Sequence, residues 1–119
     1  MSCIFCKILN KEIPSYTIYE DDLLIVFLDI NPKHNGHTLI VPKNHYKDLY
    51  DIDSYTLYKI MDKAKDICNL INDRLKPNGI TLVQNNGSVQ DIKHYHLHII
   101  PKYEKETPLT VEEIYNILK

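Results

Sequence analysis

The sequence predicts an α+β fold in which a mainly antiparallel, five-stranded sheet packs against one long helix and short terminal helices. Three observations support this class. Five short apolar runs, rich in β-branched residues, are bounded by turn residues, as strands are. Residues 53–75 repeat apolar side chains at three- and four-residue steps, which is typical of an amphipathic helix. Short turns join most strands, and the long helix falls between the third and the fourth, which favours antiparallel pairing.

The amino-terminal third of the chain is predicted to contain one short helix and three strands. Asp21 and Asp22 separate two β-rich runs and indicate a hairpin turn. A loop with Asn31-Pro32 and Asn35-Gly36 follows, and Pro42 is expected to stop the third strand. The predicted bounds are 3–9 for the helix, ending before Pro14, and 16–20, 23–29 and 37–41 for the strands.

The remainder is predicted to hold the long helix, two strands and a final helix. Asp53 or Ser54 is available to cap the long helix, which ends at Pro77-Asn78-Gly79. Strands over 80–84 and 94–101 are natural antiparallel neighbours, because only the polar loop 85–93 separates them. Thr110 with Glu113 forms a plausible capping box for a helix that runs through Leu118.

Size and charge restrict the possible functions. A chain of 119 residues that is 44% hydrophobic fits one domain over 1–119. The formal net charge is −2, and the Lys and Arg residues are scattered, so a nucleic-acid polymer is not an expected partner. No apolar run reaches the length of a membrane span, and no signal-peptide pattern opens the chain. With three cysteines, an odd number, the expected compartment is the cytoplasm.

Three of the six histidines alternate along one predicted strand: His94, His96 and His98. Their rings are expected on one face, with the apolar residues between them on the other. Burial of several titratable rings costs free energy unless partners or a reaction use them. Such histidines can hold a metal, attack phosphorus with neighbours that donate to phosphate oxygens, or be ordinary structural residues. His34, in a polar loop, is expected to be solvated.

The segment 94–100 resembles the histidine triad (HIT) motif, His-φ-His-φ-His-φ-φ with φ apolar, and matches it at every position. The blocks Asp29–Pro32 and His37–His45, and the opening Cys3–Ile8, resemble the Hint-type branch. The third histidine, His98, stands where the nucleotidyltransferase branch has Gln. The similarity covers residues 2 to about 103, and the tail 104–119 departs from the shorter Hint-type tail. The resemblance implies a HIT-like fold and a homodimer, for which residues 53–75 and 80–84 could offer an apolar edge.

The resemblance implies a nucleotide hydrolase that acts at an α-phosphorus, with purine nucleoside phosphoramidates (AMP-amines) as the expected substrates. His96 would be the nucleophile that forms a nucleotidyl intermediate, while His98 and His37 would donate to the non-bridging oxygens. Three alternatives remain open: a dinucleoside polyphosphate hydrolase, a nucleotide-binding regulatory module with little turnover, and metal-assisted hydrolysis with a metal on the triad.

The resemblance also suggests which residues contact the nucleotide. Asp29 would bind the ribose hydroxyls, Asn85 matches the phosphate-side Asn of the family, and Gln90 aligns with a family Gln. The candidates for the apolar walls around the base are Phe27, Leu39 and Ile18. The alternative is that these three side chains are ordinary core residues.

Two residues depart from the family pattern beside Gln90. Val89 stands where Gly is usual, and Asp91 stands where the Hint-type branch often has Ser. A carboxylate 4 Å from a phosphate is repelled by roughly 1 to 4 kcal/mol. Asp91 is therefore expected to turn outward, to contact an amine leaving group or to donate a proton.

Cys3-x-x-Cys6 has the spacing of half a tetrahedral zinc site. Resemblance to bacterial members that retain this pair points to His45 and His94 as the other two ligands. Four protein ligands leave no open position, so this zinc would be structural and would fix the short helix to the edge of the sheet. The alternative is a pair of unligated cysteines near the chain end.

Overall fold

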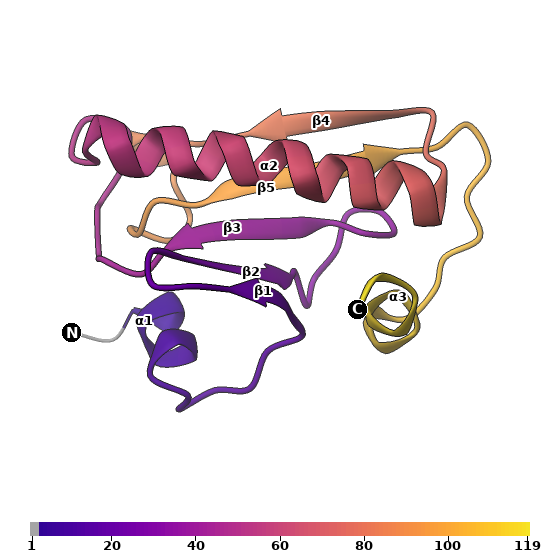
Figure 1. The fold of residues 1–119 in the computed structure, drawn as a ribbon, viewed down its shortest axis with the longest axis horizontal. Helices are drawn as coiled ribbons and strands as arrows, with labels where there is room; N and C mark the ends of the chain where they lie inside the picture. Colours follow the sequence, from indigo (N-terminus) through magenta and orange to yellow (C-terminus); the bar gives the residue numbers. More distant parts are fainter. Residues whose placement is uncertain (1–2) are drawn as a thin grey trace.

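Five antiparallel strands form one sheet, as the sequence predicts, and their order in it is β1-β2-β3-β5-β4. The computed structural model describes residues 3–119 (Figure 1). Its elements, in chain order, are α1 (Ile4–Leu9), β1 (Thr17–Glu20), β2 (Leu24–Leu28), β3 (Thr38–Pro42), α2 (Ser54–Leu75), β4 (Gly79–Val83), the 3-10 turn η1 (Gly87–Val89), β5 (Leu97–Lys102) and α3 (Val111–Leu118).

Each face of the sheet carries its own core. On one face, alternate residues of the strands pack against α2 through Ile60, Ala64, Ile67 and Ile71, and α3 adds Ile114 and Leu118. On the other face, Ile25, Phe27, Leu39 and Val41 pack against Phe5 and Ile8 of α1. Both faces of β2 and β3 are therefore buried, which explains why these strands are continuous apolar runs rather than alternating ones.

The helices end where their sequences predict. The Asp53 carboxylate accepts from the backbone N–H of Thr56 and caps α2. Lys76 ends α2 in the left-handed conformation, directly before Pro77. Thr110 and Glu113 form the predicted capping box of α3.

Two predicted strand limits at the histidines were wrong. β3 begins at Thr38 and includes Pro42, and β5 begins at Leu97 instead of His94. The pairing of β3 with β5 stops at Ile40 and Leu97. Proline has no N–H to donate, so Pro42 cannot extend this ladder, and the N–H of Tyr95 instead donates to the carbonyl of Tyr46 at 2.7 Å.

The histidine segment nevertheless keeps its alternation. Tyr95, Leu97 and Ile99 lie in the core under α2, whereas the rings of His94 and His96 contact Phe5 on the other face. The strand register then sets Phe27, Leu39, His98 and Val83 in one row across the sheet. Among residues 3–119, no helix combines the length and apolar character that a bilayer crossing requires.

Candidate active site and metal centre

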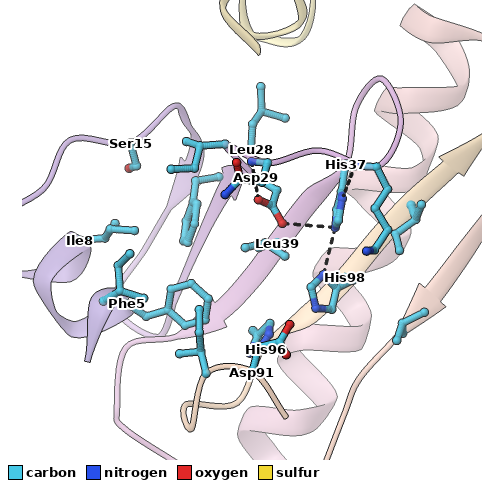
Figure 2. A pocket seen from close by; sticks show the side chains of 18 of the residues that line it. Phe5, Ile8, Ser15, Leu28, Asp29, His37, Leu39, Asp91, His96 and His98 are labelled. Atoms are coloured by element: carbon cyan, nitrogen blue, oxygen red, sulfur yellow. Dashed lines mark hydrogen bonds and ion pairs between the residues drawn. The ribbon is translucent and has the colours of Figure 1, made fainter. Parts of the chain in front are cut away.

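A cavity of about 480 Å³ opens on the face of the sheet that carries α1. Its floor contains the row from Phe27 to Val83, and its polar end contains Asp29 and the rings of His37, His96 and His98. Phe5 and Ile8 of α1 form the apolar end (Figure 2). The cavity thus joins an apolar end to a cluster of nitrogen donors and acceptors.

His96 presents an unprotonated ring nitrogen at this cavity. Its Nδ1 lies 2.8 Å from the carbonyl oxygen of His94, and a carbonyl only accepts, so Nδ1 carries the proton. Burial lowers the pKa of His96, although the hydrogen bond to His94 opposes the shift. The ring is therefore neutral near pH 7, and its Nε2 holds a free lone pair. Phe5 packs edge-on against the ring, with centroids 4.9 Å apart.

His37 and His98 form a directed chain of hydrogen bonds. The backbone N–H of Lys33 donates to Nδ1 of His37 at 3.1 Å, so the neutral His37 ring carries its proton on Nε2. That Nε2–H donates to Nδ1 of His98 at 3.0 Å, which leaves Nε2–H of His98 as a donor. Burial, with His96 and His37 nearby, lowers the pKa of His98 to about 4.

Asp29 completes the polar end of the cavity. One of its oxygens lies 3.6 Å from Nε2 of His37, and the other accepts from the backbone N–H of Asn31. Asp29, His37 and His98 lie close enough together to be considered as metal ligands. However, Nδ1 of His37 already accepts an N–H and Nε2 carries a proton, so this ring has no lone pair for a metal ion.

A second cluster, behind the cavity, could hold a metal ion: Cys3, Cys6, His45 and His94, whose ligand atoms lie within 4.8 Å of one another. The Sγ–Nδ1 separations are 3.3 Å for Cys6 with His45, and 3.5 and 3.7 Å for His94 with Cys3 and Cys6. Cys3 is also the N-cap residue of α1. The sequence prediction of which four residues converge is confirmed.

The hydrogen bonds of His94 prepare it as a ligand. Its Nε2 donates to the carbonyl of Pro42 at 2.8 Å, so the lone pair of Nδ1 faces the thiols. Burial lowers the pKa of His94 to about 4, so this lone pair stays free of a proton. Burial and the neighbouring Cys3 raise the pKa of the Cys6 thiol, so a metal would have to displace a proton there.

The other predicted nucleotide contacts divide into two groups. Asn85, Phe27 and Leu39 line the cavity, as does Asp91, which is also exposed to solvent. Gln90 and Ile18 are not among the residues that line it, and their contact with a nucleotide stays a prediction.

Gln90 and Ile18 are directed elsewhere by other contacts. Gln90 is buried, and its Nε2 donates to the carbonyl of Lys47 at 2.6 Å, while its Oε1 has no partner within residues 3–119. Ile18 packs on the core under α2 because the β1 register shifts between Thr17 and Tyr19.

Sequence reasoning did not identify the contribution of α1 to the cavity. Ile4, Phe5 and Ile8 line it, although only the cysteines of this segment were assigned a role. The available signal was the apolar side chains between those cysteines. His34 was expected to be solvated, but its Nδ1–H donates to Glu106 at 2.8 Å.

Comparisons with known proteins agree with this geometry. A family model described as HIT domain matches residues 10–105. An uncharacterized HIT-like protein of Methanocaldococcus jannaschii is 44% identical over 104 residues, which cover 86% of this chain and 80% of that protein. The adenosine 5′-monophosphoramidase of Saccharomyces cerevisiae is 39% identical over 112 residues, which cover 92% of this chain and 68% of that protein.

A solved structure shows the same similarity in three dimensions. The crystal structure of a zinc-bound histidine triad family protein from Mycobacterium smegmatis matches with a TM-score of 0.91 at 32% identity, covering 99% of this chain and 91% of that chain. With the family model, the relatives and the histidine geometry in agreement, the chain belongs to the HIT family.

Proposed function

We propose that this protein, as one HIT domain over residues 1–119, hydrolyses purine nucleoside phosphoramidates through a nucleotidyl intermediate on His96. One observation carries the proposal: Nε2 of His96 is unprotonated at the cavity, and the neighbouring His98 offers an N–H donor there. A nucleophile and an oxyanion donor on adjacent residues of one face fit substitution at phosphorus. The yeast relative named as an adenosine 5′-monophosphoramidase supports the choice of substrate.

The reaction proceeds in two displacements. Nε2 of His96 attacks the α-phosphorus, an Nε2–P bond forms and the P–N bond of the substrate breaks, with the electron pair leaving on the amine. The amine departs neutral after it gains a proton from solvent. The ring now carries a positive charge, which the carbonyl of His94 stabilises through its bond to Nδ1–H. Water then attacks phosphorus and loses a proton to solvent, the Nε2–P bond breaks with its electron pair returning to the ring, and AMP and neutral His96 result.

Of the two other histidines, His98 contacts the phosphate and His37 positions His98. His98 donates its Nε2–H to a non-bridging oxygen, where negative charge grows in the transition state. His37 acts through His98, because its only free proton is already directed at Nδ1 of that ring. This differs from the sequence-based expectation that both rings contact phosphate oxygens directly.

The nucleoside occupies the rest of the cavity. The base lies at the apolar end, between Phe5 and Ile8 of α1 and the side chains of Phe27 and Leu39. Asp29 accepts from the ribose hydroxyls with the oxygen that faces His37, and Asn85 lies on the phosphate side.

Asp91 favours an amine leaving group over a polyphosphate. Its carboxylate lines the cavity near His96, where it opposes the lowering of the His96 pKa by burial. A negative charge at this place repels an anionic leaving group by roughly 1 to 4 kcal/mol at 4 Å, whereas a neutral amine meets no such repulsion. Dinucleoside polyphosphates are therefore the less suitable substrates.

A structural zinc is proposed at Cys3, Cys6, His45 and His94. Two thiolates and two imidazoles at these separations suit a tetrahedral zinc ion and leave no open position. When bound, the ion supplies a link between α1 and the histidine segment and takes no part in the reaction. The cytoplasm is the compartment we propose, because the two thiols must stay reduced to bind it.

A homodimer is also proposed. β4 is an edge strand whose residues are mostly exposed, and both β4 and α2 carry exposed apolar side chains. The largest are Leu82, Tyr55, Tyr58 and Met61. An open strand edge together with exposed apolar side chains favours pairing with a second copy, which light scattering after gel filtration would detect.

The decisive test is to locate the covalent intermediate. The protein is mixed with an adenosine phosphoramidate, quenched in base to preserve the N–P bond, digested and mapped by mass spectrometry. The proposal expects an adenylyl group on His96, and none anywhere in His96→Ala. The variant His98→Gln retains the nucleophile and should form the same adduct more slowly. An adduct on another residue, or turnover without any adduct, contradicts the proposal, and wild-type protein without turnover indicates a binding module.

A further inference from the structure

The segment after β5 returns to the loop that precedes His37. Residues 103–109, called the clamp segment below, run from the end of β5 toward α3 and pass the loop between β2 and β3 (Figure 1). This segment lies outside the cavity and has no role in the mechanism above.

Asn35, at the tip of that loop, is held by the clamp segment through every polar group it has. Its N–H donates to Glu106 at 2.6 Å, and its carbonyl accepts from the Tyr103 hydroxyl at 2.6 Å. Its Nδ2 donates to the carbonyl of Thr107 at 2.8 Å, and its Oδ1 accepts from the N–H of Leu109 at 3.0 Å. Four bonds to one residue, from a segment about 70 positions away, define a single conformation for the loop tip.

Charge strengthens this attachment. The second oxygen of Glu106 accepts from Nδ1 of His34 at 2.8 Å. Burial raises the pKa of Glu106, but the bonds from His34 and Asn35 outweigh it, so the net shift is downward and the carboxylate stays ionised. Burial, with Glu106 nearby, raises the pKa of Tyr103 to about 12, so this hydroxyl remains a donor.

The loop tip has little room to move. Gly36 has φ +88°, and a Cβ there would lie 2.6 Å from Cδ1 of Leu75 and 3.3 Å from Cγ of Pro101. Only glycine combines that φ with so close an approach to α2 and β5. The loop is therefore wedged between these elements and the clamp segment.

The same loop determines the proton position of His37. The N–H of His37 donates to the carbonyl of His34, and the N–H of Asp29 donates to the carbonyl of His37. The backbone N–H of Lys33 donates to Nδ1 of His37, which is the contact that places the ring proton on Nε2, toward His98. All three contacts require the loop to keep its shape from Asp29 to His37.

We propose that the clamp segment is a positioning element of the catalytic site: through Asn35 and Glu106 it fixes the loop 29–37, and thereby holds the Nε2–H of His37 on His98. Asn35 and Glu106 are positioning residues, because neither lines the cavity. The kinetic consequence rests on the proposed function, whereas the consequence for the His37 ring does not.

Kinetics provide the first test, with Asn35→Ala and Glu106→Gln in the full chain. A loop displaced by about 1 Å costs on the order of 10²-fold in rate, so kcat should fall between about ten- and a hundredfold with KM within about threefold. Glu106→Asp, which keeps the charge, should recover part of the loss. The matched control is Arg74→Ala, which removes a bond from α2 to the carbonyl of Ile117 in α3 and leaves the loop untouched.

Nitrogen-15 NMR of the histidine rings provides the second test and needs no turnover. In wild-type protein Nδ1 of His37 should show the chemical shift of an unprotonated nitrogen, and Nε2 that of a protonated one. In Asn35→Ala and Glu106→Gln both shifts should move toward the average of the two tautomers, and in Arg74→Ala they should stay at wild-type values. Wild-type shifts in the two clamp variants overturn the proposal, as does a wild-type His37 protonated on Nδ1. Wild-type protein without turnover but with these ring shifts would overturn the proposed function alone.

Discussion

His94 and His96 stand two residues apart on one face of one segment, yet their hydrogen bonds orient them for opposite tasks. His94 donates from Nε2 to Pro42 and turns the lone pair of Nδ1 toward two thiols. His96 donates from Nδ1 to His94 and presents the lone pair of Nε2 to the cavity. Both rings are buried, and burial lowers both pKa values. The difference between the proposed ligand His94 and the proposed nucleophile His96 therefore lies in which ring nitrogen donates to a carbonyl.

Replacing each histidine separately should give the largest effect and separate the two tasks. His96→Ala removes the nucleophile, so kcat should fall by about 10⁴-fold or more while nucleotide affinity and metal content persist. His94→Ala should lose the metal and retain adenylylation of His96, because the backbone carbonyl at position 94 remains. Single-turnover rates, calorimetric nucleotide binding and elemental analysis measure the three quantities. Metal loss in His96→Ala, or abolished adenylylation in His94→Ala, would contradict the division.

Removing the metal should affect stability and nucleotide binding more than chemistry. Cys6→Ser should lose the ion, and a site filled at 100 times its Kd contributes about 2.7 kcal/mol to the free energy of unfolding. At about 4 °C per kcal/mol, the Tm should fall by roughly 10 °C. Nucleotide affinity should also weaken, because Phe5 and Ile8 of α1 line the cavity.

Cys68→Ser is the matched control for metal removal, since Cys68 is a free cysteine outside the metal cluster. It should leave metal content and the Tm nearly unchanged. If chelation instead abolished adenylylation of His96 in the intact wild-type protein, the metal would be catalytic rather than structural.

The groups near the lone pairs of His94 Nδ1 and His96 Nε2 also differ in charge. Thiols face His94, whereas the Asp91 carboxylate lies near His96. Asp91→Ser should raise the rate on diadenosine polyphosphate relative to adenosine phosphoramidate by about tenfold, the effect of about 1.4 kcal/mol of repulsion. Asp62→Ser, an exposed carboxylate on α2, is the control. An unchanged ratio would show that Asp91 does not contact the leaving group.

The last comparison concerns the pH dependence of stability, because burial lowers the pKa values of rings at the cavity. The pKa of His98 is about 4 in the folded protein against 6.5 as the ordinary value, and that of His37 is also lowered by burial. Between pH 6.5 and about 4 the unfolded chain binds protons that the folded rings do not, so stability should fall as pH falls through this window.

Urea unfolding of Cys6→Ser at pH 7, 6 and 5 measures this dependence without metal release. His98→Gln in the same background should reduce it, and the other buried rings should account for the remainder. A free energy of unfolding that stays constant from pH 7 to 5 would mean that the buried rings accept protons without unfolding. Turnover, which needs neutral His96, should persist below pH 6.5 for the same reason.

The spacing of residues along the sequence predicted those parts of the site that lie within one short segment. Alternation placed His96 and His98 on one face, and the spacing of Cys3 and Cys6 indicated the metal cluster. The core contact of Ile18 could not be predicted, because the pairing of β1 is irregular and a shift of one residue reverses which face of a strand a side chain occupies. The hydrogen-bond partner of His34 lies 72 positions away in the sequence, and that of Gln90 lies 43 positions away. Neighbouring residues therefore do not predict these contacts.

Main-chain atoms determine which ring nitrogen carries the proton in these histidines. The carbonyls of Pro42 and His94 and the amide of Lys33 assign the protons of His94, His96 and His37. Point substitutions exchange side chains and leave these peptide groups in place, provided the backbone path is kept. The proposed metal ligand His94 and the proposed nucleophile His96 are oriented by different peptide units. Substitution of the cysteines in a related protein would therefore leave the orientation of His96 unchanged.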